Sequence, residues 1–106
     1  MMDEKKYRSL VSETFARIEK NFEKIDPDVA ECENVAGALS ITLLGRSKLV
    51  VSPQPSVRQI WLAVASQAKA YHFNYDESSK KWLDDRGGGL ELLDEITKAV
   101  TTAVKG

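Results

Sequence analysis

Six acidic residues whose side chains could ligate a metal fall within one short stretch of this chain. They are Glu19, Glu23, Asp26, Asp28, Glu31 and Glu33. Glu19 and Glu23 are four residues apart, which on a helix places their Cβ atoms roughly 5 to 6 Å apart on one side. Carboxylates without imidazole or thiolate suit hard cations, and ferrous or ferric iron qualifies. Because the ligands come from separate elements, we expect shallow and weakly selective sites. A solvated acidic flank that binds no metal is the alternative.

Trp61 is the second residue whose setting suggests a function, because it lies inside the alternating run QIWLA. Successive side chains of a strand point to opposite faces, so Ile60 and Leu62 share one face and Gln59 and Trp61 share the other. If the aliphatic pair faces the core, Trp61 faces solvent, where a tryptophan is a natural anchor for a partner protein. The alternative is an ordinary core tryptophan.

The surroundings of Trp61 are predicted to carry no negative charge. No acid occurs between Glu33 and Asp76, a stretch that holds four of the basic residues, Arg46, Lys48, Arg58 and Lys69. Gln54, Arg58 and Gln59 would therefore add hydrogen-bond donors and a cation around Trp61. A surface of this kind, separate from an acidic one, would orient a partner.

Motifs of the common enzyme classes are missing from the sequence. The glycines at 87–89 are not followed by Lys-Ser or Lys-Thr, so they do not form a phosphate loop. There is no GxSxG motif, and Cys32 has no evident base and falls on the predicted core face of a strand. His72 is the only histidine and has no second soft ligand near it, so we expect a strand residue rather than a metal ligand. The residues predict no catalytic site.

Length and charge narrow the class of protein further. A chain of 106 residues fits a single domain spanning 1–106. Its net charge of -1 argues against a nucleic-acid partner. The single cysteine cannot form an internal disulfide, which is typical of a reducing compartment. With no secretory signal and no apolar run long enough for a bilayer, we expect no membrane partner and a cytoplasmic protein of bacterial type, although a mature mitochondrial protein would look similar.

Two helices are predicted at the ends of the chain. Apolar residues recur at helical spacing from Tyr7 to Ile25, and Pro27 ends this helix at Asp26. The second helix follows the three glycines, and its apolar positions run from Leu90 to Ala103. Each helix therefore has one stripe that faces a core.

Strands are predicted between the helices. From Val29 the period changes to two, so that Ala30 and Cys32 face the core and Glu31 and Glu33 face solvent. Further apolar runs at hairpin spacing follow, separated by turns that include Gly37 and the pair Gly45 and Arg46.

The run SPQPS at 52–56 cannot form a central strand, because its two prolines lack ladder donors. The order helix, strands, helix predicts an α+β fold. It would be a two-layer sandwich in which the N- and C-terminal helices pack on one face of a five- to six-stranded antiparallel sheet. The other face of the sheet is left open.

Taken together, these spaced elements resemble the frataxin family, and most closely its bacterial members. The matching elements are SPQPS, QIWLA, the aromatic run YHF at 71–73, Trp82, Asp84, Arg86, the three glycines and the leucine-rich segment Leu90–Ile96. The resemblance covers nearly the whole chain and is most specific over residues 54–93.

The resemblance implies iron binding. In the family an acidic ridge along the first helix and the edge of the first strand is implicated in binding iron, and the six acids named above match it. Lys20 and Lys24 interrupt the ridge where relatives usually carry more acids, and either lysine could pair with a neighbouring carboxylate. We therefore expect fewer or weaker iron sites than in a more acidic relative.

The resemblance also implies protein partners. The corresponding tryptophan lies on the sheet surface that docks the iron–sulfur assembly machinery, so the cysteine desulfurase and the scaffold protein are the implied partners. The implied contacts are Gln54, Arg58, Gln59, Trp61 and Arg86. The segment from Trp82 to Arg86 would mainly fix the closing turn. Ser52 stands where relatives often have asparagine, and Pro53 and Pro55 depart from the family's usual proline position.

Three functions follow from these features. The first is a non-enzymatic regulator or iron donor of iron–sulfur cluster biogenesis, acting as a monomer that iron could assemble into oligomers. The second is a ferroxidase that oxidises iron at the ridge and stores it in oligomers, which would need a tight site of convergent carboxylates. The third is a binding module without any role in iron chemistry. The lysine interruptions count against the second.

Overall fold

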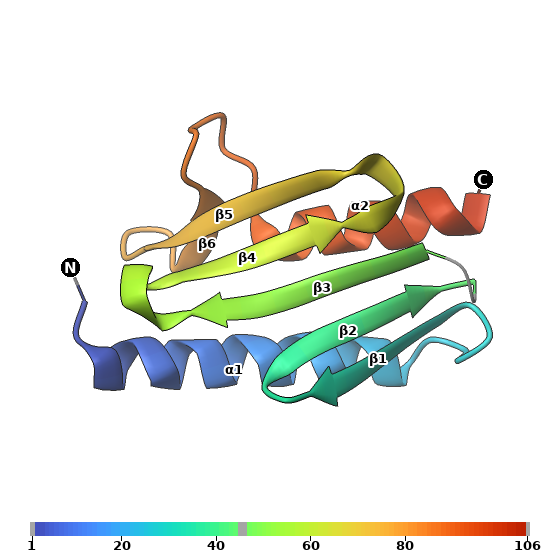
Figure 1. Ribbon diagram of the computed structural model, residues 1–106, viewed down its shortest axis with the longest axis horizontal. Helices are drawn as coiled ribbons and strands as arrows, with labels where there is room; N and C mark the ends of the chain where they lie inside the picture. Colours follow the sequence, from blue (N-terminus) through green and yellow to red (C-terminus); the bar gives the residue numbers. More distant parts are fainter. Residues whose placement is uncertain (1, 45–46, 106) are drawn as a thin grey trace.

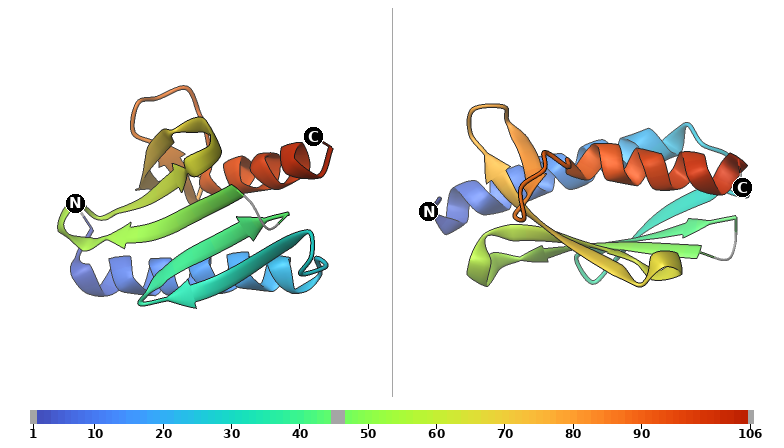
Figure 2. Two further views of the ribbon diagram at one scale, coloured as in Figure 1. Left: turned by 45° about the vertical axis from the view of Figure 1, so that its right-hand side comes forward. Right: turned by 90° about the horizontal axis from the view of Figure 1, so that it is seen from above.

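A computed structural model describes the backbone of residues 2–44 and 47–105, with side chains through residue 103. The main elements are α1 (Glu4–Glu23), β1 (Ala30–Val35), β2 (Ala38–Leu43), β3 (Ser47–Gln54), β4 (Gln59–Val64), β5 (Lys69–Asp76), β6 (Lys81–Asp84) and α2 (Leu92–Lys105). The strands form one sheet in the order β1-β2-β3-β4-β5-β6, and all neighbours are antiparallel. Figure 1 shows the sheet in front of both helices, and Figure 2 shows the two layers edge-on. The predicted sandwich is confirmed.

The first helix starts at a side-chain cap and ends earlier than predicted. Asp3 accepts a hydrogen bond from the backbone N–H of Lys6 at 2.8 Å, which satisfies one of the free amides of the first turn. Its buried stripe consists of Tyr7, Val11, Phe15, Ile18 and Phe22. The helix ends at Glu23, not at Asp26, and residues 24–29 form the turn into β1.

The core lies between the helices and one face of the sheet. Alternate strand residues fill it, and each is at most 7% exposed: Ala30, Leu39, Ile41, Leu43, Leu49, Val51, Ile60, Leu62, Val64, Phe73 and Trp82. Ile60 and Leu62 are both 0% exposed, which confirms that the aliphatic pair faces the helices. The residues between them must lie on the opposite face, which neither helix covers (Figure 2). No helix among the described residues is long and apolar enough to cross a membrane.

The prediction that SPQPS is excluded from a central strand is wrong. Pro53 lies in β3, the third strand of the sheet, opposite Ile60 of β4. The pairing of β3 with β2 reaches only Val51, however. Consecutive residues of a strand direct their backbone N–H and C=O groups to opposite neighbouring strands. The backbone groups of Gln54 point toward β4. The nitrogen of Pro53 therefore points to the side where β2 has ended, so no ladder bond is lost.

The second helix begins later than predicted, because an acidic residue caps it. The Glu91 carboxylate accepts hydrogen bonds from the backbone N–H groups of Leu93 (2.9 Å) and Asp94 (3.1 Å). Glu91 itself is only 8% exposed, and Leu90 precedes the helix. Leu92 is the fully buried residue of the first turn. The predicted turn at Gly45 and Arg46 lies outside the described residues, although Leu43 and Ser47 on either side of it are paired.

The hydroxyl of Tyr7 ties α1 to the end of the β3–β4 hairpin. It donates a hydrogen bond to the carbonyl oxygen of Gln59 at 2.6 Å and accepts one from the backbone N–H of Gln54 at 2.9 Å. Gln54 and Gln59 are the last paired residues of this hairpin. The Tyr7 hydroxyl therefore bridges the last residue pair of the β3–β4 hairpin.

Replacing Tyr7 with phenylalanine should destabilise the protein by about 1–3 kcal/mol, because it leaves one backbone donor and one acceptor without their partner. Urea unfolding followed by circular dichroism measures this change. The matched control is Tyr75→Phe, since the Tyr75 hydroxyl has no hydrogen bond within the described part of the chain. Equal free energies of unfolding for the two variants would contradict the bridging role.

Candidate functional site

Trp61 lies on the uncovered face of the sheet, as predicted. The pairing register places Ser52, Trp61 and His72 in one row across three strands, and Gln59 lies in the next row. Val50, on the same face, is 37% exposed. An apolar side chain and a tryptophan on an uncovered face are features of a protein-binding surface.

The Trp61 indole is half-buried because its own neighbours hold it. Its Nε1–H donates a hydrogen bond to Gln59 Oε1 at 2.8 Å. The His72 ring stacks on it, with a centroid distance of 4.3 Å and an interplanar angle of 19°. Sequence reasoning treated His72 as an ordinary strand residue. The equal distance of positions 61 and 72 from the β4–β5 turn would have revealed the pair.

The prediction that Trp61 has no acid near it is wrong. Asp85 Oδ2 lies 3.2 Å from Gln59 Nε2 and 3.8 Å from His72 Nδ1. Asp85 follows β6, and its backbone N–H donates a hydrogen bond to the carbonyl oxygen of His72 at 2.8 Å. Asp85 is distant from Trp61 in sequence, and the β5–β6 pairing brings it alongside.

The two predicted arginine contacts lie away from Trp61. The Arg58 guanidinium is 5.9 Å from the centre of the Tyr7 ring, and its Nε donates a hydrogen bond to the carbonyl oxygen of Met2. The Arg86 guanidinium is 5.5 Å from the centre of the Tyr71 ring. Tyr7 and Tyr71 both pack against the core. Of the five predicted contacts, only Gln54, Gln59 and Trp61 gather on the uncovered face.

The segment from Trp82 to Arg86 makes internal contacts. Trp82 is 3% exposed, and its Nε1–H donates to the Thr14 hydroxyl of α1 at 2.9 Å. The buried Asp84 carboxylate accepts a hydrogen bond from the Arg86 backbone N–H at 3.0 Å. These contacts fix the loop after β6, and they therefore also fix Asp85 within that loop.

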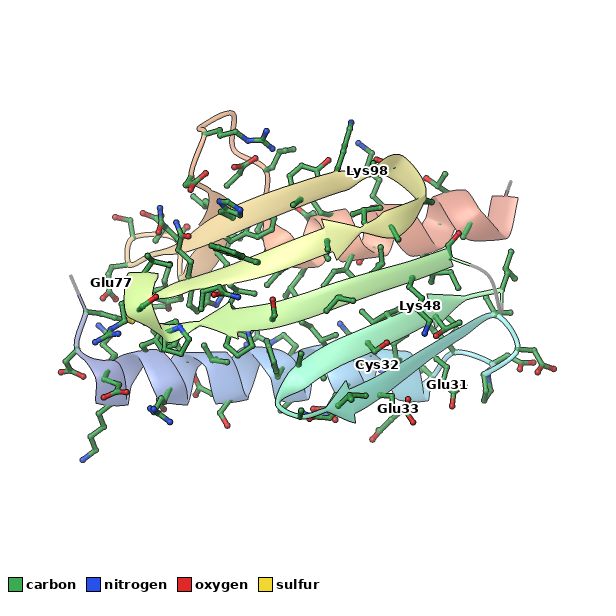
Figure 3. All side chains as sticks on the ribbon, in the orientation of Figure 1. Glu31, Cys32, Glu33, Lys48, Glu77 and Lys98 are labelled. Carbon is green, nitrogen blue, oxygen red and sulfur yellow. The ribbon has the colours of Figure 1, made fainter. Side chains whose placement is uncertain are left out.

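The six ridge acids are exposed and lie along one edge of the molecule. Glu19 and Glu23 come from α1, Asp26 and Asp28 from the turn, and Glu31 and Glu33 from β1. Figure 3 shows Glu31 and Glu33 along β1, at the edge of the sheet. Glu19, Glu23 and Glu31 also line a shallow depression of about 220 Å³ between α1 and β1.

The ridge does not form a closed metal cage. Among the described residues, no group of three or more histidine, cysteine, aspartate or glutamate side chains is arranged to hold a metal ion. The ion pairs within residues 2–44 and 47–103 include none of the six acids, and neither Lys20 nor Lys24. Such carboxylates remain hydrated and can offer oxygen ligands only by moving together. Any cation held here would be bound in an open site.

Cys32 faces the core side of β1, next to the ridge. Burial raises the pKa of its thiol to about 11, and the Glu19 carboxylate adds to this shift. The thiol is therefore protonated near neutral pH, whereas nucleophiles and soft-metal ligands require the thiolate. The raised pKa disfavours Cys32 as a ligand, so carboxylate oxygens are the main ligands that the ridge offers.

Comparison with known proteins gives matches over nearly the whole chain. The family model of the frataxin-like domain matches residues 1–106. The chain is 35% identical over 99 residues to the iron–sulfur cluster assembly protein CyaY of Pseudomonas fluorescens, covering 92% of this chain and 87% of that protein. It is 37% identical over 98 residues to the CyaY protein of Azotobacter vinelandii, covering 91% and 86%.

Solved structures match the fold. The frataxin of Psychromonas ingrahamii superposes with a TM-score of 0.84 at 24% identity, covering 98% of this chain and 93% of that one. The trimeric frataxin of Saccharomyces cerevisiae superposes with a TM-score of 0.76 at 22% identity, covering 92% and 80%. The chain thus shares its overall fold with both.

The pH dependence of Cys32 alkylation tests the position of Glu19. Iodoacetamide should react slowly at neutral pH, and its rate should keep rising between pH 8 and pH 10, because a pKa near 11 leaves mostly thiol in this range. Glu19→Gln removes a negative charge that disfavours the thiolate, so it should lower the pKa and speed the reaction at each pH. Glu13→Gln on the same helix is the control. A rate that levels off near pH 9 in the wild-type protein would contradict the burial of the thiol.

Proposed function

Because the chain belongs to the frataxin-like family, we propose that it acts in iron–sulfur cluster biogenesis in the cytoplasm. In this proposal it docks through its uncovered sheet face onto the complex of cysteine desulfurase and scaffold protein. It is not an enzyme, and it regulates that complex or supplies iron to it. The relatives named above are iron–sulfur cluster assembly proteins, which gives the proposal its pathway.

The observation that carries this proposal is the partly exposed Trp61 on a face that neither helix covers. Burying a tryptophan in a partner's pocket is among the largest single contributions to protein–protein affinity. Gln54 and Gln59 lie beside it in the pairing register and offer polar contacts. The site is a binding surface rather than a cleft, which suits a protein partner better than a small substrate.

Iron enters the proposal as weakly held cargo. Oxygen ligands from exposed carboxylates match ferrous and ferric iron in type. Glu19, Glu23 and Glu31 border one depression, which makes them the first place for such an ion. The lack of a closed arrangement among the described residues favours loose, exchangeable binding, which an iron donor needs.

The position of the ridge would let one partner reach both surfaces. Glu31 pairs with Thr42, and Glu33 pairs with Ser40, which in turn pairs with Val50. Paired residues share a face, so both glutamates lie on the same face as Trp61, at the β1 edge. A partner that covers the uncovered face would therefore also border the ridge.

Separate substitutions should divide the two activities. Trp61→Ala should weaken binding to the purified cysteine desulfurase by roughly 30-fold or more, the effect of losing an interface hot spot. Its affinity for ferrous iron should not change. The double variant Glu19→Gln/Glu23→Gln should weaken ferrous iron binding. It should leave the apolar contact of Trp61 with the desulfurase unchanged. Isothermal titration under anaerobic conditions measures both affinities.

The matched control is Val57→Ala, which truncates an exposed apolar side chain (45% exposed) in the turn before β4. It should bind the desulfurase as the wild type does. Desulfurase binding that survives Trp61→Ala would sink the proposed docking face. Iron oxidation that is fast in the wild type and lost in the double variant would instead support a ferroxidase.

A further inference from the structure

The orientation of Trp61 depends on one carboxylate from a distant part of the chain. Trp61 Nε1–H needs an acceptor, and Gln59 supplies its Oε1 at 2.8 Å. The other end of the Gln59 amide, Nε2, donates to Asp85 Oδ2 at 3.2 Å and to Asn74 Oδ1 at 3.1 Å. The Gln59 amide is thus held in one orientation from three sides.

Two of these contacts fix the direction of the Gln59 amide, because the indole N–H of Trp61 can only donate and the Asp85 carboxylate can only accept. A side-chain amide carries a donor and an acceptor at its tip, so Asn74 could satisfy Gln59 in either orientation. An ionised carboxylate can only accept. If the Gln59 amide rotated by half a turn, its oxygen would face the Asp85 carboxylate and its NH2 would face the indole N–H. Both contacts would then be repulsive.

The backbone of Asp85 is anchored to β5. Its backbone N–H is bonded to the carbonyl oxygen of His72, the residue whose ring stacks on Trp61. Its side chain is only 30% exposed. Asp85 therefore links the two groups that contact the indole, the Gln59 amide and the His72 ring.

We propose that Asp85 is a positioning residue, which holds Trp61 in its binding orientation through Gln59. Because the indole N–H is already bonded within the protein, Trp61 presents its carbon surface to a partner. The matching pocket on the partner is then apolar and needs no acceptor for the indole N–H. The partner-binding part of this inference rests on the proposed function, whereas the orientation of Trp61 in the free protein does not.

The effect on affinity follows from preorganisation. Fixing a side chain before binding removes an ordering cost that a free one would have at the interface. Replacing Asp85 with asparagine keeps the shape but allows the residue to donate, so only the indole N–H still fixes the direction of the Gln59 amide. Gln59 then spends part of its time rotated, with its oxygen away from Trp61. We expect Asp85→Asn to weaken desulfurase binding by about 3- to 10-fold, which is less than the loss caused by Trp61→Ala.

The first test uses the free protein and the two indole N–H signals in a ¹H–¹⁵N spectrum. In Asp85→Asn, the Trp61 signal should shift or broaden and its hydrogen should exchange faster with water. The Trp82 signal is the internal reference, because its N–H is bonded to Thr14 in the core.

The matched control is Asp94→Asn, because Asp94 is an exposed aspartate in α2. Gln59→Met should reproduce the Trp61 change, and it serves if Asp85→Asn fails to fold. A Trp61 signal that remains unchanged overturns the proposal.

The second test asks whether Asp85 acts through Trp61. Desulfurase affinity is measured for the wild type, Asp85→Asn, Trp61→Ala and the double variant. If Asp85 only positions Trp61, its substitution should have no further effect once Trp61 is alanine. A 3- to 10-fold loss that persists in the Trp61→Ala background would mean that Asp85 contacts the partner directly, against the proposal. If Trp61→Ala itself does not weaken binding, the proposed docking fails while the indole result still stands.

Discussion

The sheet has two faces, and both α-helices of the described residues pack on the same one. This constraint determines the role of each strand residue by its position along the strand. Ile60 and Leu62 are buried, so Trp61 between them must be on the other side. The same alternation places Cys32 against the core and its neighbours Glu31 and Glu33 in solvent. The packing of both helices on one face thus produces both the hydrophobic core and the surface that is left for binding.

Gln59, which holds Trp61 on the uncovered face, is hydrogen-bonded from both sides of the sheet. Tyr7 reaches from α1 through the core and bonds to the backbone of Gln59, while Asp85 bonds to the side chain of the same residue. Gln59 in turn is the acceptor for Trp61. A surface tryptophan is therefore connected by successive hydrogen bonds to a fully buried tyrosine, and its position depends on the packing of α1.

Periodicity predicted the layers, the antiparallel meander and the face of Trp61, because these follow from local alternation. It could not predict contacts set by the register between strands. The turn at 65–68 contains no glycine or proline that would locate it in the sequence. The equal spacing of Trp61 and His72 from this turn reveals their pairing only once the turn is located. Asp85 was not predicted near Trp61 because it is distant in sequence and only the β5–β6 pairing brings it alongside. Arg58 and Arg86 lie in turns outside the strands, where alternation predicts no face. Pro53 was excluded from β3 because sequence alone does not show where β2 ends.

The strand order has a consequence for how the chain folds. Each strand pairs with its neighbours in sequence, so the whole sheet can assemble as a series of hairpins, each of which closes a short loop. The bond between Tyr7 and Gln59 instead joins residues 52 positions apart. Closing a loop of this length has a higher entropic cost than closing a hairpin. Docking of α1 onto the sheet therefore makes contacts that are less local than those of the sheet itself.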